Sequence, residues 1–265
     1  MQSWRKIIIL LIAVNLAGLI GCSQGNETEK NGVVLPFTQQ APTVSNSTVA
    51  GVCSNPLFPV RQGASWAYIN SGGPNGDFAF SDTISEVRAD GFTLTTQFTG
   101  LTRTQAWSCE SDGLKALELG GGAIASISAQ GMAAEFITTA ISGISLPGQI
   151  VSGMQWQYNL TMQGMIPMPT GEQVQSNGAY SAAMQEMGTE TITVPAGTFE
   201  VIKFQSTSTV DFLVPFGDLQ VPMKYTGASL IWYAPGIGYI KSVENWDFGG
   251  TPYTFATELQ SYVIP

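Results

Sequence analysis

The sequence of 265 residues contains no histidine. Histidine is the usual activator of a serine or cysteine nucleophile and a common ligand of catalytic zinc, so neither kind of active site can be built here in its usual form. Two acidic pairs, Glu110 with Asp112 and Glu244 with Asp247, are the nearest candidates for the paired carboxylates of a glycosidase. Acids exposed in turns are the simpler interpretation. We therefore expect no enzyme and no cofactor, with a carbohydrate-active enzyme as the third alternative for the function.

Charged residues are scarce, and basic residues are fewer than acidic ones. Only 11% of the chain is charged, and 10 Lys and Arg stand against 19 Asp and Glu, which gives a formal net charge of −9. Nucleic acid needs a basic surface to neutralise its phosphates, so we expect no nucleic-acid partner. Anionic lipid headgroups would repel such a protein as well, and any membrane attachment must have another origin.

No hydrophobic run is long enough for a comfortable membrane span. The most apolar stretch, residues 7–20, follows Arg5 and Lys6, whereas a transmembrane helix needs about 20 apolar residues. A basic start, a short apolar region and a small residue before a cleavage point are typical of a signal peptide. The segment Leu19-Ile20-Gly21-Cys22 resembles the lipobox of bacterial lipoproteins.

This resemblance implies that residues 1–21 are removed and that Cys22 becomes an N-terminus carrying two or three acyl chains. Each buried methylene contributes about 0.8 kcal/mol, so two or three chains anchor a protein stably where one is marginal. We expect an extracytoplasmic protein held to a bacterial membrane through Cys22. Because Ser23 is not the Asp that retains lipoproteins, the outer membrane is expected where the host has one.

Three cysteines are present, and lipid on the first leaves an even pair, Cys53 and Cys109. In an oxidising compartment such a pair favours a disulfide, which would tie the start of the domain to an interior strand. The alternative is two independent thiols buried as small apolar side chains.

The composition changes near residue 50. Residues 22–50 are rich in Ser, Thr, Asn, Gln and Gly and predict a flexible tether. Residues 51–265 alternate short runs of Val, Ile, Thr, Tyr and Phe with Gly, Pro, Asn and Asp, which predicts strands and hairpins. We expect an all-β or mainly β domain, an antiparallel curved sheet or open barrel, with little helix outside the signal peptide.

Two tight turns are predicted at residues 88–91 and 194–197, each with a glycine able to take a positive φ. Strands are expected after them at residues 92–98 and 199–204, and residues 191–194 are expected to lead into the second turn. The best helix candidate, Gln130 to Ile141, is diluted by threonines and glycines, and a strand or irregular crossover is slightly favoured there.

A weak internal repeat relates residues 57–119 to residues 145–246. The pattern Gly-x-x-Trp-x-Tyr occurs at residues 63–68 and 153–158, and later in each copy a Trp is followed six residues on by Gly. The same order in both copies favours a duplicated β-meander, with an insertion in the second.

Trp and Tyr two residues apart on a strand point to the same face. Core packing is the simpler interpretation, and an aromatic wall that faces a ligand is the more specific one. The aromatic residues considered as ligand-binding are Trp66, Tyr68, Trp156, Tyr158, Trp232 and Tyr233.

The segments 190–200, with Val-Pro-Ala-Gly-Thr-Phe, and 231–241 resemble bacterial envelope families of unknown function, which also open with the pattern found here at Phe58-Pro59, Gly63, Trp66 and Tyr68. Their motifs are turns and strands, so the resemblance implies a fold and no catalytic residue. Such proteins are similar to the open antiparallel barrels of periplasmic lipoprotein carriers, whose concave face holds acyl chains.

Two patterns in the sequence contain residue types that bind metals. Met162, Met165 and Met168 follow at intervals of three, with Met184 and Met187 behind them, and thioethers can bind Cu(I). Intervals of three alternate faces on a strand, so core packing or an adaptable apolar groove is favoured.

Oxygen ligands for calcium occur at residues 75–77 and 217–218, without the dense acidic spacing of a known calcium loop. No metal site is expected from either pattern.

The leading hypothesis is a non-catalytic, lipid-anchored envelope protein that binds an apolar ligand or another envelope component. The alternative is a structural or assembly lipoprotein that recruits a protein partner through an exposed face or edge strand. An open apolar groove would favour the first, and a filled core with a flat aromatic patch the second.

Overall fold

The computed structural model describes residues 53–72, 76–120, 135–167, 173–216, 219–248 and 250–265. The predicted signal peptide, Cys22 and the predicted tether at residues 22–50 lie outside these ranges. Thr48–Pro265 is a compact unit of its own, and the description below concerns that unit. Within the described part of the chain, no helix is long and apolar enough to cross a membrane.

The described chain forms one antiparallel sheet, which confirms the predicted fold class. Its 13 strands run in the order β6-β8-β9-β10-β11-β12-β13-β1-β2-β3-β4-β5-β7. Most neighbours in the sheet are neighbours in sequence, as expected for a meander of hairpins. The strands are β1 Ser65–Gly72, β2 Phe78–Val87, β3 Gly91–Phe98, β4 Leu101–Glu110, β5 Gly113–Ala116, β6 Glu135–Gly143, β7 Leu146–Pro147, β8 Gln155–Pro167, β9 Gln173–Val194, β10 Gly197–Phe216, β11 Leu219–Ala234, β12 Gly238–Phe248 and β13 Pro252–Val263.

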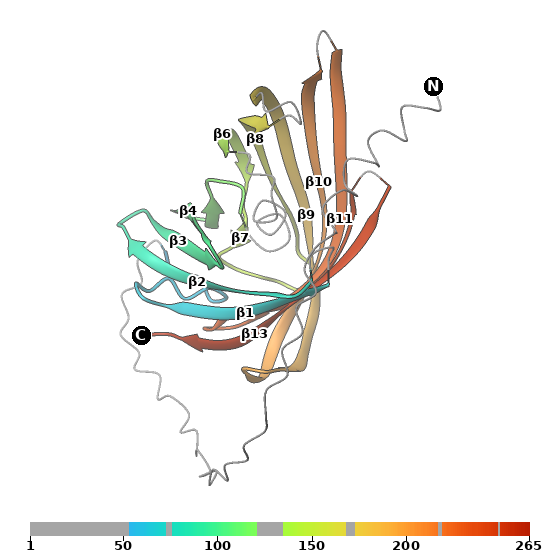
Figure 1. The fold of residues 1–265 in the computed structure, drawn as a ribbon. Coiled ribbons are helices and arrows are strands. Elements are labelled where there is room, and N and C mark those ends of the chain that lie inside the picture. The colour runs from blue at the N-terminus through green and yellow to red at the C-terminus, as the bar shows by residue number, and fades with distance from the viewer. Residues whose placement is uncertain (1–52, 73–75, 121–134, 168–172, 217–218, 249) are drawn as a thin grey trace, which may run out of the picture. The chain divides into compact units, whose positions relative to one another are not determined.

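The sheet is strongly curved, and hydrogen bonding between its strands does not close it into a barrel. β1–β3 run across the direction of the long strands β9–β11 (Figure 1). Its two edge strands, β6 and β7, do not pair with each other among the described residues. Twist accumulates from strand to strand, so a sheet of this size must curl to cover one of its own faces.

Both predicted hairpins form, and the strands expected at residues 92–98, 191–194 and 199–204 lie within β3, β9 and β10. Gly197 has the predicted positive φ, at 138°. The turn at Gly91 forms, but the positive φ predicted for this glycine was wrong, because its φ lies outside the left-handed region. A Cβ at Gly91 would instead stand 2.2 Å from the carbonyl oxygen of Trp107 on β4, so glycine is needed for close approach of two backbones.

The strand favoured over a helix within residues 130–141 is β6, whose described part begins at Glu135. Residues 130–134 lie outside the described ranges.

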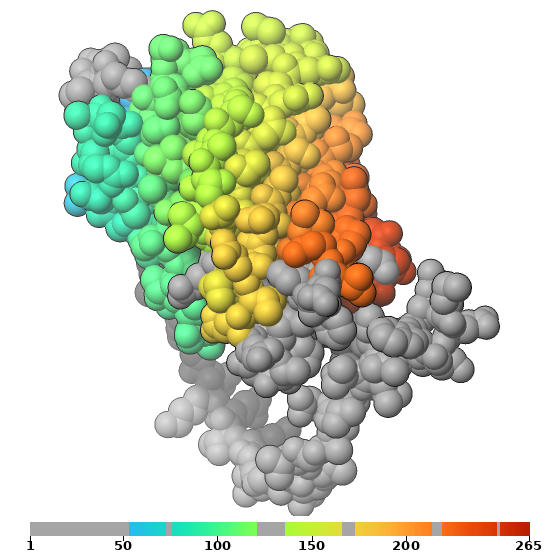
Figure 2. Space-filling view, turned by 90° about the horizontal axis from the view of Figure 1, so that it is seen from above, coloured from blue at the N-terminus to red at the C-terminus, as the bar shows by residue number. Residues whose placement is uncertain are grey.

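A short connection joins the two edges of the sheet at one end. Between β6 and β7, the Ile144 amide donates to the Gln157 carbonyl oxygen of β8 at 3.0 Å, and the Ser145 amide donates to the Leu114 carbonyl oxygen of β5 at 3.2 Å. In the space-filling view, the green residues around β4 and β5 lie against the yellow-green residues of β6 and β8 (Figure 2). The sheet is therefore bridged at this end by two residues, Ile144 and Ser145, and not by a strand pair.

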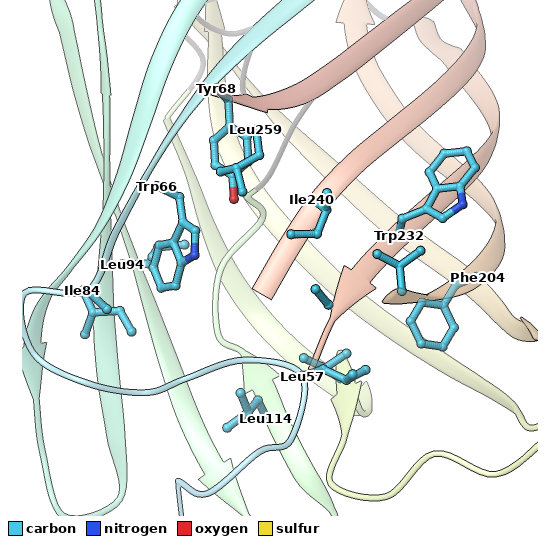
Figure 3. Close-up of a cluster of buried hydrophobic side chains, with 14 of the residues drawn as sticks. Leu57, Trp66, Tyr68, Ile84, Leu94, Leu114, Phe204, Trp232, Ile240 and Leu259 are labelled. Carbon is cyan, nitrogen blue, oxygen red and sulfur yellow. The ribbon is translucent and has the colours of Figure 1, made fainter. Parts of the chain in front are cut away.

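The segment before β1 seals the main core at the same end. Leu57 is 1% exposed, and the ring of Phe58 stacks on Trp66, Phe92 and Trp107 at centroid distances of 5.2 to 6.3 Å. Figure 3 shows Leu57 close to Leu114 beneath the side chains of β1 and β12. The N-terminal segment thus packs as part of the core.

The predicted disulfide is confirmed. Cys53 and Cys109 are bonded, with their Cα atoms 4.8 Å apart, and the bond fastens the N-terminal segment to β4. Asn55 adds a second attachment, because its side-chain amide donates to the Pro147 carbonyl oxygen of β7 at 3.0 Å.

Candidate ligand-binding face

Trp66 and Tyr68 lie on the same side of β1, which we call the inner face of the sheet. They are 1% and 3% exposed. The Trp66 indole N–H donates to the Ile237 carbonyl oxygen at 2.7 Å, and the Tyr68 hydroxyl donates to the Tyr239 carbonyl oxygen at 3.0 Å. Both rings therefore fix the start of β12 against β1, and the polar atom of each is satisfied inside the core.

Trp156 and Tyr158 repeat this arrangement on β8. The Trp156 indole N–H donates to the Ser145 carbonyl oxygen at 3.4 Å, and the Tyr158 hydroxyl donates to the Ala116 carbonyl oxygen of β5 at 2.7 Å. Burial raises the pKa of Tyr158, so the phenol stays a donor. These bonds cross from one edge region of the sheet to the other.

Trp232 has different surroundings from these four side chains. Its indole N–H donates to Glu190 at 2.5 Å, and the Lys203 ammonium lies 5.4 Å from its ring centroid. The hydrogen bond from Trp232 holds the pKa of Glu190 below its usual value. Tyr233 instead packs on Phe204 and Tyr239. The structure thus does not gather the six aromatic residues into one wall.

Five of the six are buried by other parts of the protein, as core packing requires, and Tyr233 is half-buried. A ligand-binding role for them stays a prediction.

A second group of apolar side chains on the inner face is more open than the main core. We call it the second apolar wall. Leu160 and Met162 at its base are 2% and 1% exposed, whereas the other four members are half-buried. Its members are Ile141, Leu160, Met162, Tyr180, Phe212 and Tyr225, from five strands, β6 and β8–β11.

The rings of Phe136 on β6 and Phe212 on β10 demonstrate the curvature at this wall. Three strand spacings separate β6 from β10, about 14 Å in a flat sheet, yet the ring centroids are 5.0 Å apart. The Phe212 ring covers Gly178, where a Cβ would lie 2.6 Å from it. The inner face is therefore concave here, and the wall continues into Val221 and Met223 on β11, which are 43% and 38% exposed.

A band of polar side chains, all buried except the partly accessible Glu244, lies between the main core and the second apolar wall. Its residues come from neighbouring strands and lie opposite one another. Asn70 opposes Thr257, Thr257 opposes Ser242, and Glu244 opposes Ser229. We call this group the polar band. Its members are Asn70, Ser206, Ser208, Ser229, Ser242, Glu244 and Thr257.

Glu244 is the charged member of the polar band. It accepts hydrogen bonds from the Ser242 hydroxyl at 2.9 Å and the Trp246 indole N–H at 3.1 Å. Burial raises the pKa of Glu244, although part of its surface stays accessible. Among the described residues the ion pairs number five, and Glu244 belongs to none of them.

Asp82 on β2 is a second inner-face carboxyl outside those ion pairs. The Thr96 hydroxyl donates to it at 2.5 Å, and burial raises its pKa to about 6. Sequence reasoning missed Asp82, although a signal was present. Asp82 shares the two-residue period of Phe78, Phe80 and Ile84, which places a carboxyl on the apolar face of a strand.

The two acidic pairs considered from the sequence do not form facing carboxylates. Glu110 pairs with Lys115 at 3.4 Å, and Asp112 is exposed in the turn before β5. Glu244 faces inward, whereas Asp247 is exposed and accepts a hydrogen bond from the Gly250 amide. The expectation of exposed turn acids describes Asp112 and Asp247 but was wrong for Glu244.

The candidate metal ligands are likewise dispersed. Met162 is 1% exposed and Met165 is 42% exposed, as expected for residues on opposite faces of β8, and Met168 lies outside the described ranges. Asp77 is exposed, while residues 75 and 217–218 are not described. No group of three or more Cys, Asp or Glu that could hold a metal occurs among the described residues.

The family model described as DUF3108-like matches residues 124–254, slightly less than half of the chain. No curated protein matches the sequence.

Solved structures of bacterial proteins are similar to this chain at low sequence identity. One, from Bacteroides fragilis, is described as exported and as having a YmcC-like fold; it is 11% identical, with a TM-score of 0.49 over 80% of this chain and 100% of that one. A protein from Parabacteroides distasonis described as a lipoprotein is 15% identical, with a TM-score of 0.46 over 80% and 99%. The hypothetical lipoprotein YmcC from Escherichia coli is 10% identical, with a TM-score of 0.34 over 76% and 85%. The chain is thus similar to a DUF3108-like family over its second half.

Proposed function

We propose that this protein is a lipid-anchored protein of the bacterial envelope that binds an apolar ligand on the inner face of its sheet and catalyses no reaction. One observation carries the binding proposal. The main core is closed, but the second apolar wall is half-open and borders exposed Val221 and Met223. Apolar side chains held open on a concave face are what an apolar ligand would cover.

The anchor is supported by the sequence from Leu19 to Cys22 and by the charge. With 19 acidic and 10 basic residues, the protein has no electrostatic attraction to an anionic membrane. Lipid on Cys22 supplies that attachment. In a full chain carrying Cys22→Ala we expect the protein to move from the membrane fraction to the soluble fraction, and retention in the membrane fraction would contradict the anchor.

The wall has the chemistry for a single acyl chain. Burial of each methylene contributes about 0.8 kcal/mol, so a chain of about 12 carbons gains several kcal/mol even after the cost of association. The half-buried rings of Tyr180, Phe212 and Tyr225 keep apolar surface available for such contacts. The length of the acyl chain should therefore set the apolar part of the binding free energy.

A pair of neighbouring residues on β10 tests the proposal. Phe212 belongs to the wall, and Leu213 lies on the opposite face of the same strand, 46% exposed. We expect Phe212→Asp to weaken binding of a fluorescent acyl probe at least 10-fold, because it places a charge among apolar groups. Leu213→Asp should change the affinity less than 2-fold. Equal effects of the two substitutions, or no binding by the parent chain, would refute the proposal.

The second candidate function is recruitment of a protein partner, and edge strand β6 favours it. Ile137 on β6 is 75% exposed, the highest exposure of the large apolar side chains described, and unpaired edge strands can accept another chain. Ile137→Lys should abolish co-purification of a partner if this function holds. It should leave binding of the acyl probe unchanged.

A further inference from the structure

We propose that the polar band around Glu244 is a subsite for an amine, so that the ligand of this protein is an apolar chain with a cationic amine head group. The inference rests on the proposed function, since the chain would lie on the second apolar wall. It adds the chemical class of the head group and the residues that would select it.

The first argument is the unused capacity of Glu244. A carboxylate can accept about four hydrogen bonds, and Glu244 accepts two from described residues, Ser242 and Trp246. Small residues of β11 lie opposite this part of β12. Ser229 opposes Glu244 on β11, and Gly227 opposes Trp246, whose indole would stand 2.7 Å from a Cβ at that glycine. The indole is therefore held against the backbone of β11, with its N–H bound to the carboxyl.

A second acceptor without a donor lies on the same face. Asn70 is fully buried, and its side-chain amide donates to the Thr257 hydroxyl at 2.8 Å, but its Oδ1 has no partner. Thr257 is the register partner of both Asn70 and Ser242, so these three residues lie in one row across the sheet. Glu244 lies two residues beyond Ser242 on the same face of β12. A buried acceptor left unpaired destabilises the folded state, so the band lacks donors and not acceptors.

The third argument is charge. No described Lys or Arg forms an ion pair with Glu244, and Lys241 on the same strand is bound to Glu258 at 2.7 Å. Burial removes most of the water around Glu244, and no cationic side chain of the described residues compensates its charge. An ammonium group supplies the missing positive charge and up to three N–H donors at once. A carboxylate or phosphate head group would be repelled.

The polar band and the second apolar wall are continuous. The Tyr180 hydroxyl of the wall lies 3.4 Å from the hydroxyl of Ser208 in the band. Burial, with a smaller contribution from the charge of Glu244, raises the pKa of Tyr180. A chain packed on the wall can thus end at the band. This placement orients the ligand with its head toward Glu244 and its tail toward Val221 and Met223.

Three probes with one chain length and different head groups test the inference: dodecylamine, dodecanol and dodecanoate. Binding is measured by calorimetry on the full chain carrying Cys22→Ala. We expect dodecylamine to bind at least 10-fold more tightly than dodecanol, and dodecanoate more weakly than both. In Glu244→Gln, which keeps the size of the side chain and removes its charge, the amine and the alcohol should bind within 2-fold of each other.

Glu258→Gln is the matched control, because it neutralises a carboxylate of β13 that already has Lys241 as its partner; the amine preference should persist there. Should Glu244→Gln fail to fold, the ¹³C shift of the Glu244 carboxyl in the parent chain gives a second readout. Dodecylamine should move its titration to lower pH, and dodecanol should not.

The outcomes separate the two proposals. Equal affinity for amine and alcohol in the parent chain, or an amine preference that survives Glu244→Gln, overturns the amine subsite and leaves the apolar-ligand function standing. No binding of any of the three probes overturns the apolar-ligand function itself.

Discussion

Asp82 shows how a single residue on the inner face couples stability to pH. Its carboxyl lies among apolar side chains of β2 with Thr96 as its hydrogen-bond donor. Desolvation disfavours the charged form, so the folded-state pKa of about 6 stands above the ordinary value of 3.8 for an aspartate. The folded state then binds more protons than the unfolded state between these two values. Stability conferred by protonated Asp82 is present below pH 4 and is lost as pH rises through 6.

We predict that Asp82→Asn removes this pH dependence. The two pKa values differ by about 2 units, equivalent to about 3 kcal/mol at 1.36 kcal/mol per unit, so the variant should be more stable than the parent chain at pH 7 by up to that amount. The free energy of unfolding in urea, measured at pH 4, 5, 6 and 7, checks this. A parent chain whose stability does not fall over this range would contradict the prediction, and Asp112→Asn in an exposed turn is the control.

At the scale of elements, hairpins and strand periodicity were predictable because they depend on local chemistry. The turns at residues 88–91 and 194–197 and the strands that follow them form as predicted. The need for glycine at position 91 was not predictable, because it depends on the close approach of Trp107 from a different strand. The Gly-x-x-Trp-x-Tyr segments also adopt matching geometry, with φ of 83° at Gly63 and 73° at Gly153. That match supports the duplication, which stays a prediction.

Two glycines, Gly91 at the β2–β3 turn and Gly100 at the β3–β4 turn, are needed for different reasons. Gly91 allows two backbones to approach closely, and Gly100 adopts a left-handed backbone conformation. Gly91→Ala would push a Cβ to 2.2 Å from a carbonyl oxygen, whereas Gly100, with φ of 78°, has nothing within 4 Å of a Cβ. We expect Gly100→Ala to cost about 1–2 kcal/mol from the left-handed backbone alone. Gly91→Ala should cost more, because β3 and β4 must move apart. Thermal unfolding of both variants tests this order, and the reverse order would contradict it.

The whole domain depends on contacts between residues that are far apart in the sequence. The disulfide joins residues 56 positions apart, the Trp66 indole reaches Ile237, and the connection at residues 144–145 bridges β8 and β5. Together they hold the curved sheet in the shape that forms the second apolar wall. Loss of one such link should therefore affect the shape as well as the stability of the inner face.

Reduction of the disulfide provides the test at this scale. Opening a loop of 56 residues should lower the free energy of unfolding by about 4 kcal/mol on the chain-entropy estimate. Urea unfolding with and without reductant measures the change in the Cys22→Ala background, which has no third thiol. Cys53→Ala/Cys109→Ala should behave like the reduced protein, and should show no further effect of reductant. Identical unfolding midpoints in both conditions would contradict the expected contribution.

The sequence by itself determined the strands, the hairpins, the disulfide partners and the acidic, histidine-free composition. Each of these follows from residue type and short-range spacing. Only the tertiary structure decided that Trp232 binds Glu190, that Asp82 and Glu244 face inward, and that Phe136 meets Phe212 across three strand spacings. The physical reason is curvature. The direction in which a sheet bends, and the strands that it brings face to face, depend on the twist summed over all strands and on bridges between residues distant in sequence.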